Sequence, residues 1–468
     1  MDTVITNGTV VTSSGISRAD VGIAGGRIAA IGPDLAVAGA KVVDAAGCYV
    51  IPGGIDVHTH LDTPAFNATT ADDFESGTRA AACGGTTSIV DFCQQPHGAS
   101  LAEALRIWHG KAAGKAAIDY GFHIIISEMT DAVLDELASL PDQGITSFKL
   151  FMAYRGMLYV DDLALVRAID TARQAGALVM VHAENGDAAW YLQRKYVAAG
   201  KTAPKYHAET RPPRVEAEAT ARAIALAEVL DASVYIVHLT CRESLEEVVR
   251  GRMRGVDVLA ETCTQYLYTT KDDLDREGFE GAKYVFTPPA RTREDQEALW
   301  HALSHRTLEL VSSDHSSWNF KGDKDLGIDD FSKIPNGAPG IEERMTMVYQ
   351  GVNDGRISLT QFVELTATRP AQIFGLFPQK GTIAIGSDAD VVIWDPAAER
   401  TIRQADLHHA VDYTLFEGRK VKGAPRTVML RGELLVEDGV YRGKPGGGQF
   451  LKRQKYRRNL VAANSRSA

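Results

Sequence analysis

Cysteine is scarce in this sequence, with five residues among 468. The five are an odd number, stand far apart and form no CxxC pair; they are Cys48, Cys83, Cys93, Cys241 and Cys263. This spacing argues against a disulfide framework or a zinc ribbon, and it is typical of a reducing compartment. We therefore expect a cytoplasmic protein whose stability depends on a large buried core.

Long apolar runs are also missing. No stretch reaches the roughly 18 apolar residues that a membrane-spanning helix needs. The opening MDTVITNGTV has neither the basic region nor the apolar region of a secretory signal. We expect a soluble protein that does not associate with membranes.

Positive charge is in the minority, since 50 Lys and Arg residues stand against 60 Asp and Glu residues and the net charge is −10. This balance disfavours the phosphate backbone of a nucleic acid as partner. The one local exception is the basic run KRQKYRR at residues 452–458. We expect this run to be a solvated tail, or an arm on a neighbouring subunit, rather than an RNA-binding element.

The two ends of the chain share a strand-like pattern. Short β-branched stretches joined by glycine turns fill residues 1–50 and return at 381–396 and 426–439. Because these stretches look alike and differ from the region between them, we expect the two ends to pair into one small β domain.

The central region, residues 51–380, alternates short apolar runs with alanine-rich helical segments. Eight runs are expected to be strands: 51–58, 86–92, 120–126, 145–151, 177–183, 233–239, 256–262 and 308–314. Continuous apolar strands that alternate with helices indicate a parallel sheet covered on both faces. Eight such units predict a (β/α)8 TIM barrel, in which catalytic residues lie at the C-terminal ends of the strands.

Six residues with metal-binding or acid–base chemistry stand at or just beyond the ends of these strands: His58, His60, Lys149, His182, His238 and Asp314. His58 and His60 lie on the same side of an extended chain because side chains alternate between faces. Each residue taken singly has an ordinary structural role; His182, for example, could hydrogen-bond Glu184 or a loop. Because the barrel rule brings all six to one mouth, we favour a shared site.

Four imidazoles and one carboxylate exceed the three protein ligands that a catalytic zinc usually takes. They suit two ions that share a bridging ligand. Lys149 is one candidate for the bridge, because a buried lysine has a lowered pKa and a neutral amine can add carbon dioxide to become a carbamate. A salt bridge from Lys149 to Asp314 or Glu184 is the alternative, and the residues alone leave both open.

Two ions would also hold a bridging hydroxide, since zinc lowers the pKa of bound water to about 7. Such a hydroxide attacks the carbonyl of an amide or an ester. Asp314 could take its proton and hand it to the leaving nitrogen. Tyr154, just after the fourth predicted strand, could donate its phenol to the developing oxyanion, or it could simply be a stacking wall of the cleft.

These residues and the motifs around them resemble the cyclic amidohydrolases of the hydantoinase and dihydropyrimidinase group, most closely the bacterial D-selective members. The resemblance covers essentially the whole chain. It is carried by GGIDVHTH, TSFKLFMAYRGM, VHAENGD, YIVHLTC, FTPPAR, SSDHSSW, PNGAPGIEER and KGTIAIGSDADVVIWDP.

The resemblance implies a β-sandwich, built from residues 1–51 and 381–440, beside a TIM barrel at 52–380, with a C-terminal arm at 441–468. It implies two zinc ions, with manganese or cobalt as alternatives, bridged by a hydroxide and by Lys149 as N6-carboxylysine. One ion is expected to bind His58, His60, Lys149 and Asp314; the other is expected to bind Lys149, His182 and His238. It also implies a homotetramer.

The same resemblance assigns the substrate contacts. Tyr154 is expected to be the oxyanion donor, and Asp314 the proton shuttle. Main-chain groups of Thr287, where relatives carry serine, and of Asn336 are expected to anchor the amides of the ring. A second departure from the family is Gln265, where many relatives carry histidine, and its expected role lies outside the ligand set.

The substituent outside the ring is expected to meet the loops around the mouth of the barrel, where specificity generally lies in this fold. From position and analogy, we expect Thr63, Ala65, Phe151 and Leu158 to line this pocket. The small Ala65 favours a roomy wall that tolerates aromatic substituents.

Related proteins narrow the expected reaction. Dihydroorotases are similar, but they place an arginine two residues after the His-x-His to hold a substrate carboxylate, and this sequence has Asp62 there. Neuronal response-mediator proteins resemble the same fold and act as binding modules without the metal ligands, all of which are present here. We therefore expect an enzyme that opens a cyclic ureide or imide, namely 5-substituted hydantoins with D selectivity and also dihydropyrimidines, to N-carbamoyl amino acids. Dihydropyrimidinase proper and allantoinase are the alternatives.

Overall fold

The N-terminal region forms most of a small β domain in the computed structural model, which describes residues 1–36 and 38–458. One sheet has four strands in the order β5-β4-β1-β6. Its strands are β1 (Thr3–Thr6), β4 (Asp20–Ala24), β5 (Arg27–Gly32) and β6 (Lys41–Asp44).

The second sheet of this domain joins the two ends of the chain. Its seven strands follow the order β21-β20-β19-β18-β7-β2-β3. They are β2 (Thr9–Thr12), β3 (Gly15–Arg18), β7 (Tyr49–Pro52), β18 (Val391–Thr401), β19 (Lys420–Leu430), β20 (Glu433–Glu437) and β21 (Val440–Tyr441). The N-terminal β7 pairs antiparallel with the C-terminal β18, as the shared pattern of the two ends predicts.

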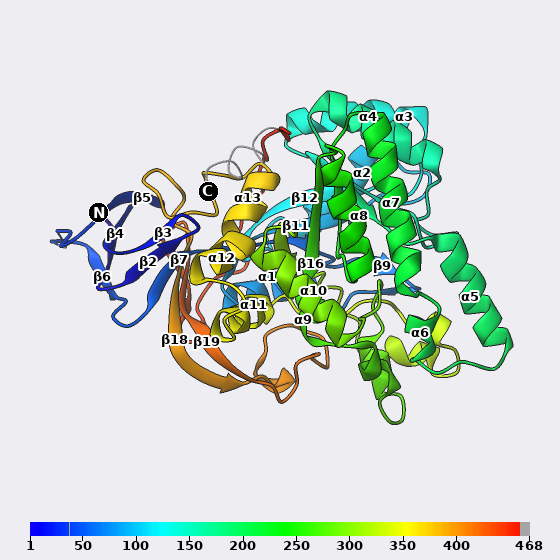
Figure 1. The fold of residues 1–468 in the computed structure, drawn as a ribbon. Coiled ribbons are helices and arrows are strands. Elements are labelled where there is room, and N and C mark those ends of the chain that lie inside the picture. Colours follow the sequence, from blue (N-terminus) through cyan, green and yellow to red (C-terminus); the bar gives the residue numbers. More distant parts are fainter. Residues whose placement is uncertain (37, 459–468) are drawn as a thin grey trace.

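The two sheets pack face to face around a common apolar core. Val21 and Ile23 of the smaller sheet share this core with Val50, Val391 and Ile393 of the larger one. Burial of such side chains on the inner faces stabilises a sandwich. Figure 1 shows these strands gathered at one end of the molecule, beside the barrel. The domain boundaries at residues 51, 380 and 440 stay predictions.

The central region is the predicted eight-stranded parallel barrel. Its strands follow the order β17-β16-β15-β14-β13-β12-β11-β8, and Thr59 at the end of β8 pairs in parallel with His315, just beyond β17, to close the ring. Every residue of these strands but Gln94 is buried, which explains their continuous apolar runs. They are β8 (Gly54–Thr59), β11 (Thr86–Gln94), β12 (Asp119–Ile125), β13 (Ser147–Phe151), β14 (Leu178–His182), β15 (Val234–Ile236), β16 (Val258–Cys263) and β17 (Leu310–Ser312).

Helices cover the outside of the barrel (Figure 1). Local signals fix their ends; in α4, for example, the Asp161 carboxylate caps the N-terminus through Ala164 N–H, and Gly176 ends the helix in the left-handed conformation. The helices are α1 (Phe74–Cys83), α2 (Leu101–Ala112), α3 (Asp131–Ser139), α4 (Asp162–Ala175), α5 (Gly186–Ala198), α6 (Tyr206–Glu209), α7 (Pro213–Val229), α8 (Arg242–Met253), α9 (Thr264–Tyr268), α10 (Arg293–Ser304), α11 (Arg344–Asn353), α12 (Leu359–Val363) and α13 (Arg369–Ile373).

The C-terminal segment differs from the sequence-based expectation of a solvated or intersubunit arm. Residues 449–458 run across the N-terminal end of their own barrel: Leu451 N–H donates to Tyr120 O, and Gln454 N–H donates to Gly375 O. Arg453, the second residue of the basic run, is only 3% exposed, and its guanidinium donates to Phe122 O. The run therefore packs as part of the barrel floor. The rest of the predicted arm, residues 459–468, lies outside the described residues.

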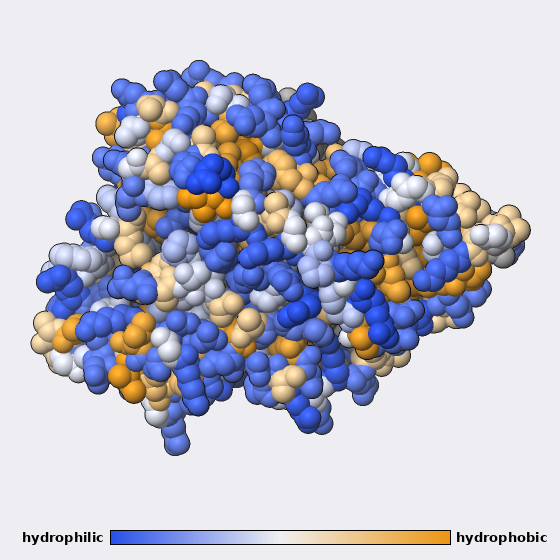
Figure 2. Space-filling model, turned by 180° about the vertical axis from the view of Figure 1, so that it is seen from behind, coloured by the Kyte–Doolittle hydropathy of each residue, from blue (hydrophilic) through white to orange (hydrophobic). Residues whose placement is uncertain are grey.

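One face of the molecular surface can be followed in Figure 2. In Figure 2, the face opposite to that of Figure 1 is mainly hydrophilic, with hydrophobic residues in small separate groups. Among the described residues, no helix is long and apolar enough to cross a membrane.

Candidate functional site

The six residues singled out at strand ends come together at one mouth of the barrel. His58 lies in β8 and His60 just after it, Lys149 lies in β13, and His182 ends β14. His238 and Asp314 follow β15 and β17 by two residues. Parallel strands of a closed barrel all end at the same rim, so residues far apart in sequence become neighbours.

One half of the cluster is centred on the side chain of His58. Its Nε2 atom lies 2.9 Å from Lys149 Nζ and 3.1 Å from Asp314 Oδ1. The same carboxylate oxygen lies 3.5 Å from His60 Nε2. Four potential ligand atoms therefore surround one small volume.

The other half of the cluster is a pair of imidazoles. His182 Nδ1 and His238 Nε2 are 2.9 Å apart, and the rings of His58 and His238 are 5.4 Å apart. His238 Nδ1 is buried and has no hydrogen-bond partner in the described part of the chain. A buried nitrogen without a partner is costly unless another group binds it.

Burial lowers the pKa of several members of this cluster, whereas in His58 the carboxylates of Asp314 and Glu261 outweigh burial and raise the pKa of the imidazole. Burial lowers the pKa of His60 to about 3 and that of Lys149 to about 8. Burial opposes ionisation of Asp314, yet the contacts with His58 and His60 hold the pKa of its carboxyl well below the ordinary value. Neutral imidazoles beside an ionised carboxylate are the donors that divalent transition metals take.

Lys149 has no ion pair with Asp314 or Glu184 within the described residues; its Nζ instead lies 4.1 Å from the ring centroid of Phe92. This weakens the salt-bridge alternative for Lys149. Taken together, the His238 nitrogen without a partner in the described residues, the low pKa of the His60 imidazole and the Asp314 carboxylate fit a pair of divalent ions.

Two carboxylates behind the cluster were missed by the sequence analysis or seen only as alternatives. Glu261 Oε1 accepts from His58 Nδ1 at 2.5 Å, and Glu184 Oε2 pairs with His182 Nε2 at 2.8 Å. Glu261 also accepts from the Tyr235 hydroxyl. Such contacts fix which imidazole nitrogen is free to bind a metal. The sequence offered one signal for Glu261, namely that it places a carboxylate inside the apolar run 256–262.

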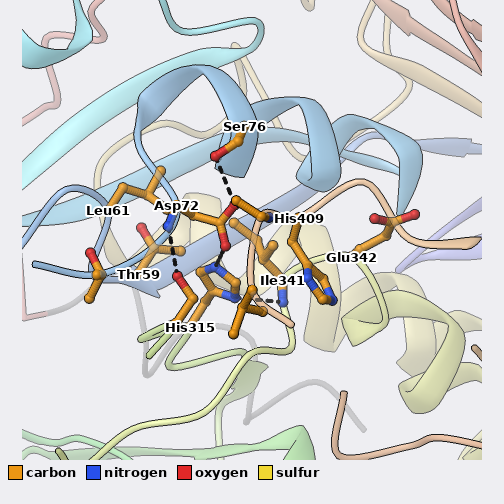
Figure 3. A network of polar contacts seen from close by, with 12 residues as sticks. Thr59, Leu61, Asp72, Ser76, His315, Ile341, Glu342 and His409 are labelled. Atoms are coloured by element: carbon orange, nitrogen blue, oxygen red, sulfur yellow. Dashed lines mark hydrogen bonds and ion pairs between the residues drawn. The ribbon is translucent and has the colours of Figure 1, made fainter. Parts of the chain in front are cut away.

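A third carboxylate, Asp72, holds the residue next to Asp314. Asp72 Oδ2 accepts from His315 Nε2 at 3.1 Å, while His315 Nδ1 accepts from the amide of Gly340 at 3.1 Å. Asp72 also accepts from Ser76 Oγ. Figure 3 shows Asp72 between Ser76 and His315, with Ile341 beside the imidazole. The network fixes the orientation of the His315 ring, with Nε2 toward Asp72 and Nδ1 toward Gly340, and with it the backbone that carries Asp314.

A cavity of about 80 Å³ opens beside the cluster. All the pocket and substrate residues named from the sequence line it, namely Thr63, Ala65, Phe151, Tyr154, Leu158, Thr287 and Asn336, together with the cluster residues His60, Lys149, His182, His238 and Asp314.

The aromatic walls of this cavity include two residues that the sequence analysis missed. Phe66 lies in the turn between β9 (Pro64–Ala65) and β10 (Ala68–Thr69), and its ring packs edge-on against Trp318 and Tyr154. Both Phe66 and Trp318 line the cavity. They stand on loops, where no periodic pattern indicates the direction of a side chain.

Tyr154 is held toward the cavity by an unusual backbone. Its φ angle is 65°, a left-handed conformation that is uncommon outside glycine and is frequent at functional sites. Burial raises the pKa of its phenol to about 12, so the hydroxyl keeps its proton at neutral pH. It accepts a long hydrogen bond of 3.4 Å from Asn336 Nδ2.

Gln265, a departure from the family pattern, and Asp62, which stands where dihydroorotases carry an arginine, both lie away from the cavity. Gln265 is buried at the start of α9 and is not a lining residue. Asp62 lies 3.8 Å from Lys111 Nζ and does not line the cavity either. The position that would carry a carboxylate-binding arginine is thus paired with a lysine.

A second group of potential ligands, Cys83, Glu342 and His408, lies outside the barrel mouth. Both Glu342 oxygens already accept hydrogen bonds from His408, and the Arg79 guanidinium lies against the His408 carbonyl. Since this carboxylate is satisfied and a cation is adjacent, we interpret the group as a contact between α1 and the loop before β19.

Comparison with known proteins agrees with this fold. The model of the Amidohydrolase family matches residues 49–435, and that of the Urease alpha-subunit, N-terminal domain, matches residues 1–51. The chain therefore belongs to the amidohydrolase family, whose members generally depend on a binuclear metal centre.

Individual relatives span the whole chain. A D-hydantoinase of Rhizobium radiobacter is 64% identical over 457 residues, which cover 98% of this chain and 100% of the relative. A solved structure of a D-hydantoinase is 65% identical with a TM-score of 0.97, over 98% of this chain and 100% of that one. A dihydropyrimidinase from Brevibacillus agri is 50% identical, with a TM-score of 0.97 and the same coverage.

Proposed function

We propose that this protein hydrolyses the ring amide of 5-substituted hydantoins and releases N-carbamoyl amino acids with D configuration. The observation that carries the proposal is one cavity lined by five of the six cluster residues, by Tyr154, and by Thr287 and Asn336. Such a cavity offers a flat cyclic ureide both a reactive centre and an anchor. The D-hydantoinase relatives support the ring type and the configuration.

We propose that two divalent metal ions, zinc first and manganese or cobalt as alternatives, belong to this cavity. His58, His60, Lys149 and Asp314 would hold one ion, and Lys149, His182 and His238 the other. Bound there, the ions would supply an activated water and polarise the ring carbonyl. A set of nitrogen and oxygen ligands binds each of these metals, so the metal that occupies the site would depend on which one is available.

The carboxylated form of Lys149 is part of this proposal. Carbon dioxide adds to a neutral amine, and burial has brought the pKa of Lys149 down to about 8, so a substantial fraction is neutral near physiological pH. The added carbon dioxide would turn one nitrogen donor into two carboxylate oxygens, which suit a shared ligand. Among the described residues, no carboxylate forms an ion pair with Lys149, and this favours the carboxylated form.

Residues of the protein itself would transfer the proton, stabilise the developing charge and hold the substrate ring. Asp314, held ionised by its imidazole neighbours, would accept the proton of the attacking water and pass it to the ring nitrogen as the C–N bond breaks. The Tyr154 hydroxyl, protonated at neutral pH, would donate to the carbonyl oxygen as negative charge develops there. Main-chain groups of Thr287 and Asn336 would hold the ring amides.

The substituent outside the ring would lie among Thr63, Ala65, Phe151 and Leu158, with Phe66 and Trp318 as further walls. An aromatic lining favours aryl substituents because flat rings pack against each other edge to face. Six-membered dihydropyrimidines are the second candidate substrate, supported by the dihydropyrimidinase relative. A cytoplasmic homotetramer completes the proposal.

The test is initial-rate hydrolysis of a racemic 5-arylhydantoin by protein reconstituted with zinc and bicarbonate, with products separated by chiral chromatography. Formation of the D-N-carbamoyl acid alone is the expected result. Formation of the L product would overturn the proposed configuration and keep the reaction. No turnover at full metal occupancy would overturn the hydantoin assignment and make dihydrouracil and allantoin the next substrates to measure.

A further inference from the structure

Lys324 is a buried lysine that the reaction above does not use. It lies in the short 3₁₀ helix η4 (Lys324–Gly327) and is fully buried. Its Nζ donates to Val285 O at 2.9 Å and to Pro335 O at 3.1 Å. In the described part of the chain, no carboxylate lies within ion-pair distance of it. A buried lysine without such a partner is rare, because burial of an unpaired charge costs free energy.

The two carbonyls that Lys324 binds belong to the two segments that form the proposed ring anchor. Val285 lies two residues before Thr287, and Pro335 lies directly before Asn336. The segments are about 50 residues apart in sequence, and the amide of Gly337 also joins them by donating to Val285 O at 3.1 Å. Hydrogen bonds from Lys324 and Gly337 therefore connect the two segments to each other.

Other contacts hold each segment singly. His207 Nε2 bonds to Phe286 O at 2.9 Å, and Trp318 Nε1 donates to Asn336 O at 3.0 Å. The base of η4 is equally fixed, because a Cβ at Gly327 would lie 2.6 Å from the backbone nitrogen of Ile334. The Lys324 side chain thus extends from a rigid base to both segments at once.

We propose that Lys324 is a positioning residue that sets the separation between the main-chain groups of Thr287 and Asn336 and so determines how tightly the substrate ring is held. The inference rests on the proposed function, because it concerns the ring anchor of that site. Lys324 does not line the cavity, so it acts only through the backbone.

The protonation state of Lys324 matters little for this role. Burial lowers the pKa of its side chain to about 7, so both forms are present near neutral pH. A neutral amine keeps two N–H groups and an ammonium has three, and two acceptors are available. Either form can therefore hold both carbonyls, which explains how the lysine is tolerated without a carboxylate.

The experiment compares Lys324→Met with Lys321→Met, which removes an exposed lysine three residues away. With a 5-arylhydantoin as substrate, we expect KM of Lys324→Met to rise about 10-fold, about what the loss of one hydrogen bond to the ring would give, while kcat changes much less because the anchor binds ground state and transition state alike. Lys321→Met is expected to behave as wild type. Lys324→Arg, which keeps donors for both carbonyls, is expected to recover most of the loss in KM.

Hydrogen exchange gives a readout that needs no turnover. In Lys324→Met we expect faster exchange of amides in residues 283–290 and 333–340 together, with the rest of the barrel unchanged. An unchanged KM with unchanged exchange, or a loss spread over the whole barrel, would overturn the inference. If Lys324→Met does not fold, Lys324→Gln, whose shorter amide cannot reach both carbonyls, takes its place with the same expected split. If the wild-type protein does not hydrolyse the hydantoin, the proposed function alone is overturned. The exchange result would still test the role of Lys324.

Discussion

Glu261 and His58 form the shortest contact behind the proposed metal cluster, with 2.5 Å between Glu261 Oε1 and His58 Nδ1. Because a carboxylate accepts, the imidazole proton lies on Nδ1. The opposite nitrogen, Nε2, is left free and faces Lys149 and Asp314. Glu261 thus determines which nitrogen of His58 can bind a metal.

Glu261→Gln is therefore expected to weaken metal retention by about 10- to 100-fold, the usual effect of losing such a supporting carboxylate. The measurement is the metal content and activity left after dialysis against graded concentrations of chelator. Glu309→Gln is the control, because Glu309 is also buried but pairs with Arg369 away from the cluster. Equal retention in both variants would contradict the role of Glu261.

Lys149→Ala is expected to lose activity to the background level, because the proposed bridge between the ions disappears. A short carboxylic acid such as acetate or propionate is expected to restore part of the rate by supplying the missing oxygens. The rate is measured against acid concentration, with His238→Ala as the control that no acid should restore. A variant that keeps its full metal content and shows no rescue would argue against carboxylation of Lys149.

Tyr154→Phe is expected to lower kcat by about 10²- to 10³-fold, as removal of an oxyanion donor does. KM is expected to change little, because the phenol acts mainly on charge that develops during the reaction. Steady-state kinetics on one arylhydantoin measure both constants. Tyr159→Phe, five residues further on and outside the cavity lining, is the control. A fall limited to KM would instead make Tyr154 a wall of the pocket.

Leu158→Trp is expected to narrow the pocket for the substituent outside the ring. The ratio of kcat/KM for a phenyl-substituted to that for a methyl-substituted hydantoin should fall by about 10-fold or more, within the range that steric discrimination gives. Leu163→Trp is the control, since Leu163 is 67% exposed on α4. An unchanged ratio in Leu158→Trp would remove Leu158 from the pocket.

A pH-dependent contribution to stability is expected from His409. Burial alone would lower the pKa of this imidazole, but the carboxylate of Glu343 raises it to about 9. Because the folded-state pKa is above the unfolded value of about 6.5, this stabilisation is complete below pH 6.5 and is lost as the pH rises through 9. The shift of the pKa from about 6.5 to about 9 sets an upper limit of about 3 kcal/mol. Because the two groups are 3.9 Å apart without a hydrogen bond, we expect on the order of 1 kcal/mol.

The measurement is the difference in free energy of unfolding between wild type and His409→Asn at several pH values. The difference should be largest near pH 6 and should shrink toward pH 9.5. The same change at the exposed His305 is the control and should show no such trend. A difference that grows with pH would contradict the assignment of the His409–Glu343 pair.

Much of the fold follows from local patterns in the sequence. The eight apolar runs are the eight barrel strands, because a strand buried on both faces has apolar residues without alternation. Short β-branched stretches joined by glycine turns occur at both chain ends and predicted their shared β domain, which the pairing of β7 with β18 confirms. His58, His60 and His182 could be named as site candidates because their position at a strand end is itself a local property.

The tertiary structure alone decided the contacts between residues that no local pattern joins. Glu261 and Asp72 were missed because their partners are 203 and 243 residues away, and periodicity reports only on near neighbours. Phe66 and Trp318 stand on loops, where the side-chain direction depends on what packs against them. The basic run around Arg453 has a composition typical of a solvated tail, yet it packs along the barrel with Arg453 buried, because the floor of the barrel offers backbone carbonyls that the sequence of the run does not reveal.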